Sequence, residues 1–326
     1  MKTDFRNILV IQTAFIGDAI LASSVLEKLH QYFPEASVSI LVRNGNESLY
    51  QAHPFLKQIL VWNKSNAKYV ELFKVRKQIK QNKFDAVINL HRYTSSGFLT
   101  AFSGAKYKAG FNEGFLSFFF TKKVKHIIGD GRHETTRYNE LIEDITDKTV
   151  FKPKLYPTPQ DFDIVQKYKT GKYVCISPSS VWRTKQLPEA KWLELCDNLP
   201  EDVTIYLLGS KNDIGICNSL KSKSKHKNSK VVAGELTLLQ SAALIKDAHM
   251  NYVNDSAPLH LASATNAPVT AFFCSTVPAF GFTPLSDNSK IVEVKNLECR
   301  PCGLHGVKDC PLGHFKCGFD IDVKSI

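Results

Sequence analysis

Short apolar runs alternate along the chain with longer stretches in which apolar residues recur every three or four positions. The first run, residues 8–11, predicts a buried strand, and the spacing after it predicts a helix from about Asp18. The alternation continues with predicted strands at 37–42, 58–62 and 85–90 and predicted helices around 46–52 and at 67–82. Alternating strands and helices are typical of a parallel, doubly wound sheet.

The pattern changes in the middle of the chain. Residues 93–130 are irregular and rich in Gly and Phe, and a helix is predicted over residues 132–145. Residues 148–162 contain three prolines and no helical period, which predicts an interdomain linker. We therefore expect two domains, residues 1–155 and 156–326.

A second alternation follows the linker. A strand and loop are predicted at 173–180, a strand at 203–210, helices at 188–199 and 236–248, and a strand, loop, helix and strand at 249–273. At 326 residues the chain is long enough for each half to bury its own core. The predicted fold class is α/β, with two facing Rossmann-like domains and a cleft between them.

Composition narrows the choice of class. The hydrophobic fraction of 43% and the charged fraction of 22% are those of a folded soluble protein. The formal net charge of +11 favours a nucleic acid, an anionic membrane surface or a phosphorylated substrate as partner. Neither a signal peptide nor a long uncharged stretch is apparent, so we expect a cytoplasmic protein.

One aromatic run stands apart from the predicted elements. Residues 115–120 read FLSFFF, and the lysines that flank them are Lys106, Lys108, Lys122 and Lys123. The run is too short to span a bilayer. We expect it to form a core helix or strand, and contact with a membrane surface is the alternative.

The loop after the first strand contains Gly17 and Asp18. Ligands of open α/β sheets bind at the carboxyl ends of the strands, where this loop lies. The loop lacks the GxGxxG pattern, so a dinucleotide site is not expected. Asp18 is either a helix N-cap or a general base whose pKa is raised by partial desolvation.

Two segments of the second half also follow predicted strands. The first has Ser179 and Ser180 with Lys185 nearby, a set that suits a diphosphate, although a basic loop without a ligand is the alternative. In the second, Asp255 precedes a predicted helix that carries His260. The amides of the helix N-terminus favour oxyanions there, which indicates a binding site. The alternative is that Asp255 is only a cap and His260 only structural.

Taken together, these segments resemble glycosyltransferase family 9, the lipopolysaccharide heptosyltransferases. The family signature of Asp, Thr or Ser, Gly, two further residues and His is similar to residues 255–260. The amino-terminal Gly-Asp pair of the family is similar to Gly17 and Asp18, and its lysine before Trp-Pro to Lys185 before Pro188. The three segments occur in the family's order along nearly the whole chain.

The resemblance implies a GT-B fold and an inverting transfer that needs no metal or other cofactor. The donor would be ADP-L-glycero-D-manno-heptose, and the acceptor the lipopolysaccharide inner core, Kdo-lipid A or heptosyl-Kdo-lipid A. Asp18 would be the catalytic base. The residues implied for donor binding are Ser179, Ser180, Lys185, Asp255, Ser256, Ala257 and His260. The implied partners are a nucleotide-sugar, a lipid-linked acidic saccharide and an anionic inner-membrane surface, with the protein peripherally attached, and no nucleic acid.

Two positions depart from the family pattern. Ala257 stands where the family has glycine, and Leu239 stands where an acidic residue often contacts the ribose. Glu235 or Gln240 would have to replace that acidic residue. Another nucleotide-sugar or acceptor within the same family is therefore the alternative to ADP-heptose and the inner core.

Four of the eight cysteines cluster near the C-terminus: Cys299, Cys302, Cys310 and Cys317. A CxxC pair followed by two further cysteines predicts a structural zinc site that pins this segment, with reduced thiols or disulfides as alternatives. A basic zinc-bearing nucleic-acid-binding protein is the alternative from another functional class. No basic recognition helix surrounds the cysteines, and that alternative leaves the two nucleotide-type halves unexplained.

Overall fold

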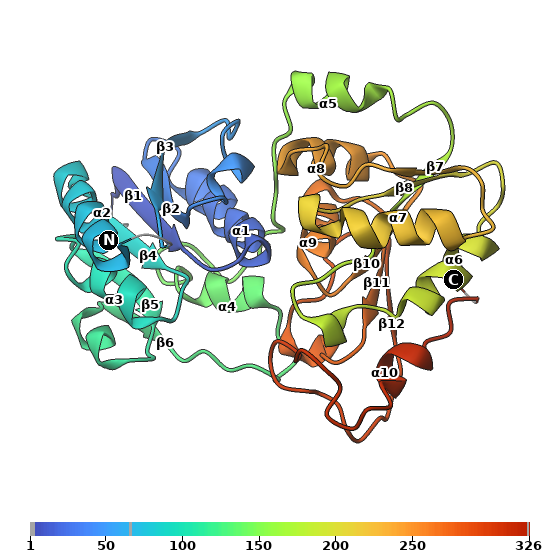
Figure 1. Ribbon diagram of the computed structural model, residues 1–326. Helices are drawn as coiled ribbons and strands as arrows, with labels where there is room; N and C mark the ends of the chain where they lie inside the picture. The colour runs from blue at the N-terminus through green and yellow to red at the C-terminus, as the bar shows by residue number, and fades with distance from the viewer. Residues whose placement is uncertain (1–3, 65–66, 325) are drawn as a thin grey trace. The chain divides into compact units, whose positions relative to one another are not determined.

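A computed structural model describes residues 4–64, 67–324 and 326. The chain forms two compact units (Figure 1). Unit 1 comprises Met1–Ile128 and Arg132–Tyr156, and unit 2 comprises Gly129–Gly131 and Pro157–Ile326. The main boundary between the units therefore falls at residues 156 and 157.

Unit 1 contains a six-stranded parallel sheet in the order β3-β2-β1-β4-β5-β6. Its strands are β1 (Asn7–Gln12), β2 (Ser37–Arg43), β3 (Leu56–Trp62), β4 (Ala86–Asn89), β5 (Tyr107–Phe111) and β6 (Lys122–Val124). Its helices are α1 (Ile16–Tyr32), α2 (Lys68–Asn82), α3 (Thr94–Ala101) and α4 (Glu134–Glu140), with the 3-10 turns η1 (Glu47–Leu49) and η2 (Phe115–Phe119).

The central strand β1 shows why its sequence is a continuous apolar run. Leu9 and Ile11 pack in one cluster with Leu72 and Val75 of α2 and with Leu99 of α3. The intervening residues of β1 point to the opposite face, and α1 runs beside the sheet on that side (Figure 1). Both faces of a doubly wound sheet are covered, so the interior of the strand, Ile8 to Ile11, is apolar on both faces.

Unit 2 repeats this architecture, with the sheet order β12-β11-β10-β7-β8-β9. Its strands are β7 (Tyr173–Ser177), β8 (Thr204–Leu207), β9 (Ser229–Val231), β10 (Met250–Asn254), β11 (Val269–Phe273) and β12 (Ser289–Glu293). Its helices are α5 (Pro159–Gln166), α6 (Glu189–Asn198), α7 (Ile214–Lys223), α8 (Leu238–Lys246), α9 (Ala257–Thr265) and α10 (Lys316–Phe319). Its 3-10 turns are η3 (Arg183–Lys185), η4 (Lys211–Asp213) and η5 (Pro278–Phe280).

Aromatic packing anchors α6 to the sheet of unit 2. The ring of Trp192 meets that of Phe272 of β11 edge to face, with 5.2 Å between centroids. Ile176 of β7 and Leu207 of β8 belong to the same buried cluster. Edge-to-face pairs contribute about 0.5–1.5 kcal/mol beyond the burial of their area.

Both sheets reverse their strand order at one point, between β1 and β4 in unit 1 and between β7 and β10 in unit 2. The prediction of parallel, doubly wound α/β sheets is confirmed. In such sheets the loops that follow the two strands at the reversal diverge to opposite faces and leave room for a ligand. The structure thus provides one switch point in each unit.

Several local predictions are wrong. The irregular segment 93–130 contains α3, β5, η2 and β6, and the helix predicted around 46–52 is only η1. The predicted linker contains the start of α5, which Thr158 and Asp161 open with a reciprocal capping box. A capping box followed by a proline at the first helical position starts a helix despite the local proline content.

The aromatic run is also placed differently from the prediction of a core element. Leu116 and Phe120 are buried, but Phe115, Phe118 and Phe119 point outward from η2. The short 3-10 turn is the reason, because it has too few residues to bury every ring against the unit. Within the described part of the chain, no helix combines the length and apolar character needed to cross a membrane.

Candidate functional site

Asp18 lies at the switch point of unit 1, in the first turn of α1 just after β1. Phe15, with an extended backbone, is the N-cap of α1. The N-cap interpretation of Asp18 is therefore wrong, because its carboxylate belongs to the third helical residue. Its side chain remains partly accessible.

The surroundings of Asp18 make it a proton acceptor near neutral pH. Burial, followed by the negative charge of Glu134, raises the pKa of Asp18 to about 7. The backbone N–H groups of Asp18 and Phe15 and the charge of Arg92 act in the opposite direction and are outweighed. A carboxyl group with this pKa is half ionised near pH 7 and returns a captured proton easily.

Glu134 stays ionised beside Asp18 because two basic groups hold it. Its carboxylate lies 2.9 Å from Nε2 of His126 and accepts a 2.9 Å hydrogen bond from Arg137. Burial raises the pKa of Glu134, but the interactions with His126 and Arg137 outweigh burial and lower it overall. This buried trio fixes a negative charge that acts on Asp18.

Two other strands of this sheet, β3 and β4, are followed by basic groups at the same edge of the sheet. Lys64, after β3, donates a 2.6 Å hydrogen bond to the carbonyl oxygen of Thr13, whose hydroxyl lies 3.0 Å from Nδ1 of His91. Burial, followed by the charge of Arg43, lowers the pKa of Lys64 to about 8. Arg92, after β4, completes a positive rim that suits an acidic ligand.

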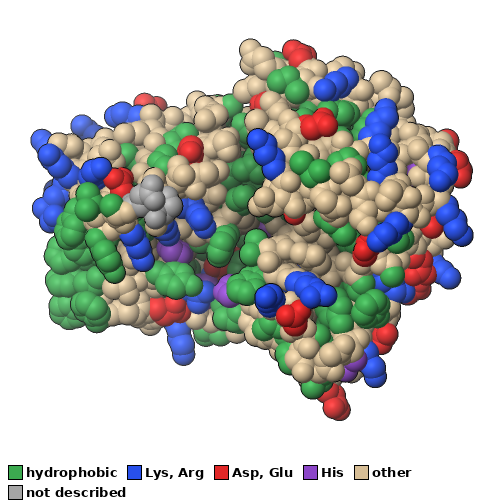
Figure 2. Space-filling view, viewed as in Figure 1, with side chains coloured by type: hydrophobic (Ala, Val, Ile, Leu, Met, Phe, Trp, Pro, Cys, Tyr) green, Lys and Arg blue, Asp and Glu red, His purple; other side chains and the backbone are tan. Residues whose placement is uncertain are grey.

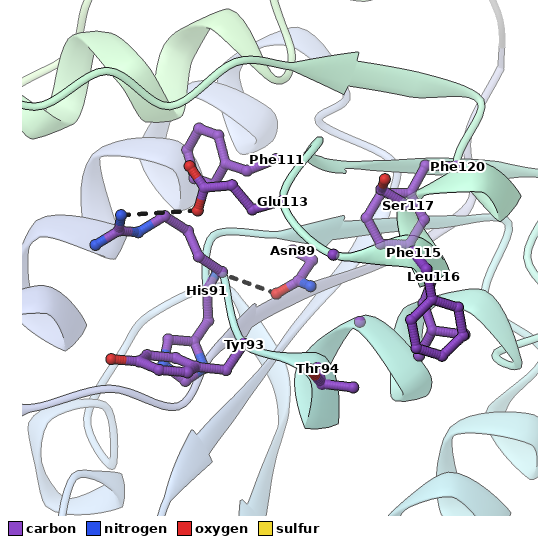
Figure 3. Close-up of a pocket in the computed structure, with 13 residues that line it drawn as sticks. Asn89, His91, Tyr93, Thr94, Phe111, Glu113, Phe115, Leu116, Ser117 and Phe120 are labelled. Atoms are coloured by element: carbon purple, nitrogen blue, oxygen red, sulfur yellow. Dashed lines mark hydrogen bonds and ion pairs between the residues drawn. The ribbon is translucent and has the colours of Figure 1, made fainter.

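A pocket opens beside this rim, at the carboxyl ends of β4 and β5 (Figure 3). Arg92 and Glu113 both line it and form an ion pair with 3.7 Å between their charged atoms, and the backbone N–H of His91 donates to Asn89 Oδ1. Phe115 and Leu116 of η2 form an apolar wall. The cavity volume is about 10 Å³, so the pocket is a shallow notch beside the rim that a ligand would lie against and not an enclosed small-molecule site.

Asn254 organises the switch point of unit 2. It ends β10, its Oδ1 accepts the backbone N–H of Leu187 at 2.8 Å, and its Nδ2 donates to the carbonyl oxygen of Pro178 at 2.8 Å. Asn254 is completely buried, so both bonds are shielded from water. They hold both ends of the loop 178–187, which contains Ser179, Ser180 and Lys185, beside the end of β10.

Lys185 and Asp255 come together at this point. Lys185 Nζ lies 2.7 Å from Asp255 Oδ2, which also accepts a 2.6 Å hydrogen bond from the hydroxyl of Thr276. The Lys185 side chain is 16% exposed and that of Asp255 is 8% exposed. An ammonium group has three donors, so this pairing orients Lys185 and leaves donors for a ligand.

Three serines surround the start of α9. Ser256 is the N-cap of α9, and its hydroxyl donates a 3.4 Å hydrogen bond to the carbonyl oxygen of Ser179. The carbonyl oxygen of Ser180 accepts a bond from Gln186. Ala257 is the first helical residue of α9, a position that L residues adopt without strain. The departure from glycine is therefore compatible with the local fold.

The other predicted donor residues lie in more enclosed positions. His260, one turn into α9, is buried, with its ring 6.4 Å from that of Phe282. Leu239 is a core residue of α8. Gln240 closes the capping box of α8, whereas Glu235 is exposed and accepts a hydrogen bond from Tyr168. Of the two proposed replacements for the missing acidic residue, Glu235 is the more accessible.

Sequence reasoning missed the support of Lys185 by the cysteine-rich segment. The neighbouring Thr184 exchanges two 2.8 Å hydrogen bonds with the backbone of Val307 through its hydroxyl. Gly306 has φ of +75°, and a Cβ there would lie 2.8 Å from Ser275 Oγ and 3.0 Å from Lys185 Cγ. The signal in the sequence was Gly306, four residues after Cys302, because glycine allows this close approach.

The four clustered cysteines are free thiols, as are the other four. Burial, followed by the thiols of Cys299 and Cys310, raises the pKa of Cys302. Cys317 is buried in the unit 2 core. Across the described residues, which include all four cysteines, no group of three or more His, Cys, Asp or Glu is arranged to hold a metal ion. The thiols as placed do not form a tetrahedral site, and zinc remains a prediction for metal analysis of the purified protein.

Comparisons with known proteins agree with this geometry. The family model described as glycosyltransferase family 9 (heptosyltransferase) matches residues 72–312. Lipooligosaccharide heptosyltransferase 2 of Campylobacter jejuni is 25% identical over 322 residues, which cover 96% of this chain and 94% of that protein.

Solved structures identify the fold. A glycosyl transferase family 9 protein from Veillonella parvula matches with a TM-score of 0.81 at 20% identity, over 89% of this chain and 86% of that one. E. coli ADP-heptose lps heptosyltransferase II matches with a TM-score of 0.78 at 19% identity, over 90% and 92% of the two chains. The fold is GT-B, built from two Rossmann-like α/β units, as the sequence predicted.

Proposed function

Since the chain belongs to glycosyltransferase family 9 and is a glycosyltransferase, we propose that it transfers heptose from ADP-L-glycero-D-manno-heptose to the inner core of lipopolysaccharide. The observation that carries the proposal is the contrast between the two switch points. One presents a carboxyl group with a pKa near 7, and the other presents an oriented lysine beside a helix N-terminus. Family membership also favours an enzyme over the nucleic-acid-binding alternative.

In this proposal, unit 2 binds the donor. Lys185 and the N-terminal amides of α9 would contact the diphosphate, with Ser179, Ser180 and Ser256 beside it. As the bond to the sugar breaks, negative charge grows on the departing diphosphate oxygen. A fixed ammonium group and helix amides stabilise that charge in the transition state more than in the ground state.

Unit 1 would supply the base. The ionised carboxylate of Asp18 accepts the proton of the acceptor hydroxyl while the hydroxyl oxygen attacks the anomeric carbon. The bond from that carbon to the diphosphate oxygen breaks, and ADP leaves with its electron pair. One displacement from the face opposite the leaving group inverts the anomeric centre, so the product needs no covalent enzyme intermediate.

The acceptor would lie against the positive rim and pocket of unit 1. Arg92 lines that pocket and also influences the pKa of Asp18, so one residue links acceptor binding to the base. The acidic groups of an inner-core saccharide match the charges of Arg92 and Lys64. We place the reaction at the cytoplasmic face of the inner membrane, because that acceptor is lipid-linked.

The proposal is tested first on the donor. Purified protein is heated with ADP-heptose, other ADP-sugars, UDP-sugars and GDP-sugars, and the melting temperature is followed. A ligand that binds only the native state stabilises it, by about 2.7 kcal/mol at a hundredfold excess over Kd, and so raises the melting temperature. We expect the largest rise with ADP-heptose.

Transfer itself is then measured by mass spectrometry of the acceptor. ADP-heptose with Kdo-lipid A or heptosyl-Kdo-lipid A should give a product heavier by one heptose. A preference for a UDP- or GDP-sugar in both assays would reject the proposed donor and support the alternative within the family. Product from a different saccharide alone would reject the proposed acceptor.

A further inference from the structure

Unit 1 exposes an aromatic surface that, apart from Phe115 in the pocket wall, the proposed reaction does not use. We call it the aromatic plate, and it is formed by Phe73, Phe98, Phe102, Phe115, Phe118 and Phe119. These residues come from α2, from α3 and its C-cap Phe102, and from η2, three elements that pack together. Figure 2 shows hydrophobic side chains gathered over this region at the left edge of the view, with Lys and Arg side chains beside them.

Five of the six rings, all except that of Phe115, form a connected layer. Phe98 lies 5.7 Å from Phe73 and 5.1 Å from Phe102, and Phe119 lies 5.8 Å from both Phe102 and Phe118. Phe118 is 79% exposed and Phe115 78% exposed. An apolar surface of this extent on a soluble unit marks an interaction site, because leaving it in water costs free energy.

The charges around the plate select the kind of partner. The segment 68–83, which contains α2, has six Lys or Arg residues and one Glu, and the segment 94–125 has five Lys residues and one Glu. The guanidinium of Arg76 lies 5.8 Å from the ring centroids of both Phe98 and Phe102. Aromatic rings within a basic border match an anionic lipid surface, where rings enter the headgroup region and cations meet the phosphates.

We propose that the aromatic plate docks unit 1 onto an anionic phospholipid bilayer. The rings of η2 enter the interface, and the lysines of α2 contact lipid phosphates. The plate is continuous with the pocket beside the positive rim, because Phe115 belongs to the plate and also lines the pocket. A bilayer on the plate therefore presents lipid headgroups to the pocket mouth.

This inference rests on the proposed function in one respect, which is that the acceptor is attached to lipid. Docking would confine the search for that acceptor to the membrane plane and leave the chemistry to the switch points. Vesicle binding without any sugar tests the plate separately from the reaction. Inactivity of the wild-type protein with ADP-heptose and both lipid-linked acceptors would reject the proposed function without altering the vesicle result.

The experiment measures co-flotation of the whole chain with vesicles. Wild-type protein should bind vesicles of phosphatidylethanolamine and phosphatidylglycerol, and should not bind vesicles of phosphatidylcholine alone. Binding should weaken as salt is raised. The double variant Phe118→Ser with Phe119→Ser should bind at least about tenfold more weakly, because two rings no longer leave water.

A matched control replaces exposed apolar residues elsewhere. Ile164→Ser with Ile214→Ser changes residues that are 46% and 39% exposed on helices of unit 2, and it should bind like the wild type. Replacing Lys77 with Gln should weaken binding to anionic vesicles about fivefold and should remove part of the salt dependence. Melting temperatures of all variants identify any that are misfolded.

Three outcomes would overturn the proposal. One is equal binding of the Phe118 and Phe119 double variant and the wild type to anionic vesicles. Another is no vesicle binding by a folded wild-type protein. The third is a self-associating wild type, seen by analytical ultracentrifugation, that the same double variant converts to monomers without any lipid effect, because the plate would then bind a second copy of the chain.

Discussion

The two units share one sheet order and one switch-point geometry, yet the side chains at the two switch points differ in kind. Unit 1 places Asp18 next to the fixed charge of Glu134, in surroundings that resist ionisation. Unit 2 places Lys185 against Asp255, in surroundings that hold a cation in one orientation. The same backbone plan thus supports a base in one unit and a diphosphate site in the other, because function depends on the residues placed on a fold.

The largest expected effect comes from removing the base. Asp18→Asn should lower kcat by about 10²–10⁴-fold, the usual contribution of general base catalysis. ADP affinity should stay within about twofold, because unit 2 is unchanged. Rates are measured by single-turnover transfer and affinity by calorimetry. A variant with full activity would remove Asp18 from the mechanism.

Removing the ammonium group of Lys185 should affect ADP binding, which the change at Asp18 should leave almost unaltered. Lys185→Ala should weaken ADP binding by about 10–100-fold, because a charged hydrogen bond contributes about 1.5–3 kcal/mol. Arg183→Ala is the matched control, because Arg183 lies in the same turn as Lys185. The Arg183 side chain is 76% exposed and pairs with the exposed Asp309. Calorimetry on both variants checks this, and equal ADP affinities would contradict a phosphate role for Lys185.

The support of Lys185 by the cysteine-rich segment should have a smaller effect. Gly306→Ala forces a Cβ against Lys185 and Ser275, and should weaken ADP binding about fivefold, or ~1 kcal/mol. Gly303→Ala is the control, because Gly303 has the same φ of +75° and nothing within 4 Å of its Cβ position. Both variants should lose about 1–2 kcal/mol of stability through backbone strain. Identical ADP affinities would show that the segment does not position Lys185.

The smallest effect at neutral pH concerns the charge beside the base. Because Asp18 accepts a proton only when ionised, kcat/KM should fall as the pH is lowered through about 7. Glu134→Gln removes the like charge that raises the pKa of Asp18, so the acidic limb should move to lower pH. A pH–rate profile checks the direction, with melting temperature as the control for folding. An unmoved limb would show that burial alone sets this pKa.

Much of the fold could be predicted because its signals are local. A strand that is buried on both faces of its sheet has a continuous apolar run, and such runs predicted β1, β2, β4, β7 and β10. The elements between residues 93 and 130 were missed because they are short and their apolar residues are divided between core and surface. The start of α5 was missed because its proline-rich composition outweighed a readable capping box at Thr158 and Asp161.

The candidate site was only partly predictable, because only some of its features have local signals in the sequence. Asp18, Lys185 and Asp255 could be selected because each follows a predicted strand, where α/β sheets bind ligands. The contact of Lys185 with Asp255 joins residues 70 positions apart, and no local pattern encodes that pairing. Thr276 and Gly306 were not selected because their contribution depends entirely on where later segments of the chain pack.

The sequence by itself determined the parallel α/β architecture and the strand ends that carry the candidate chemistry. Apolar runs and the alternation of strands with helices can be recognised from neighbouring residues, and this is the physical reason. Tertiary structure alone decided that Asp18 lies beside an ionised Glu134, that Lys185 is held by Asp255, and that the aromatic rings of η2 face outward. Those properties depend on burial and on distances between segments far apart in the chain, and hydrogen bonds and charge interactions change steeply with both.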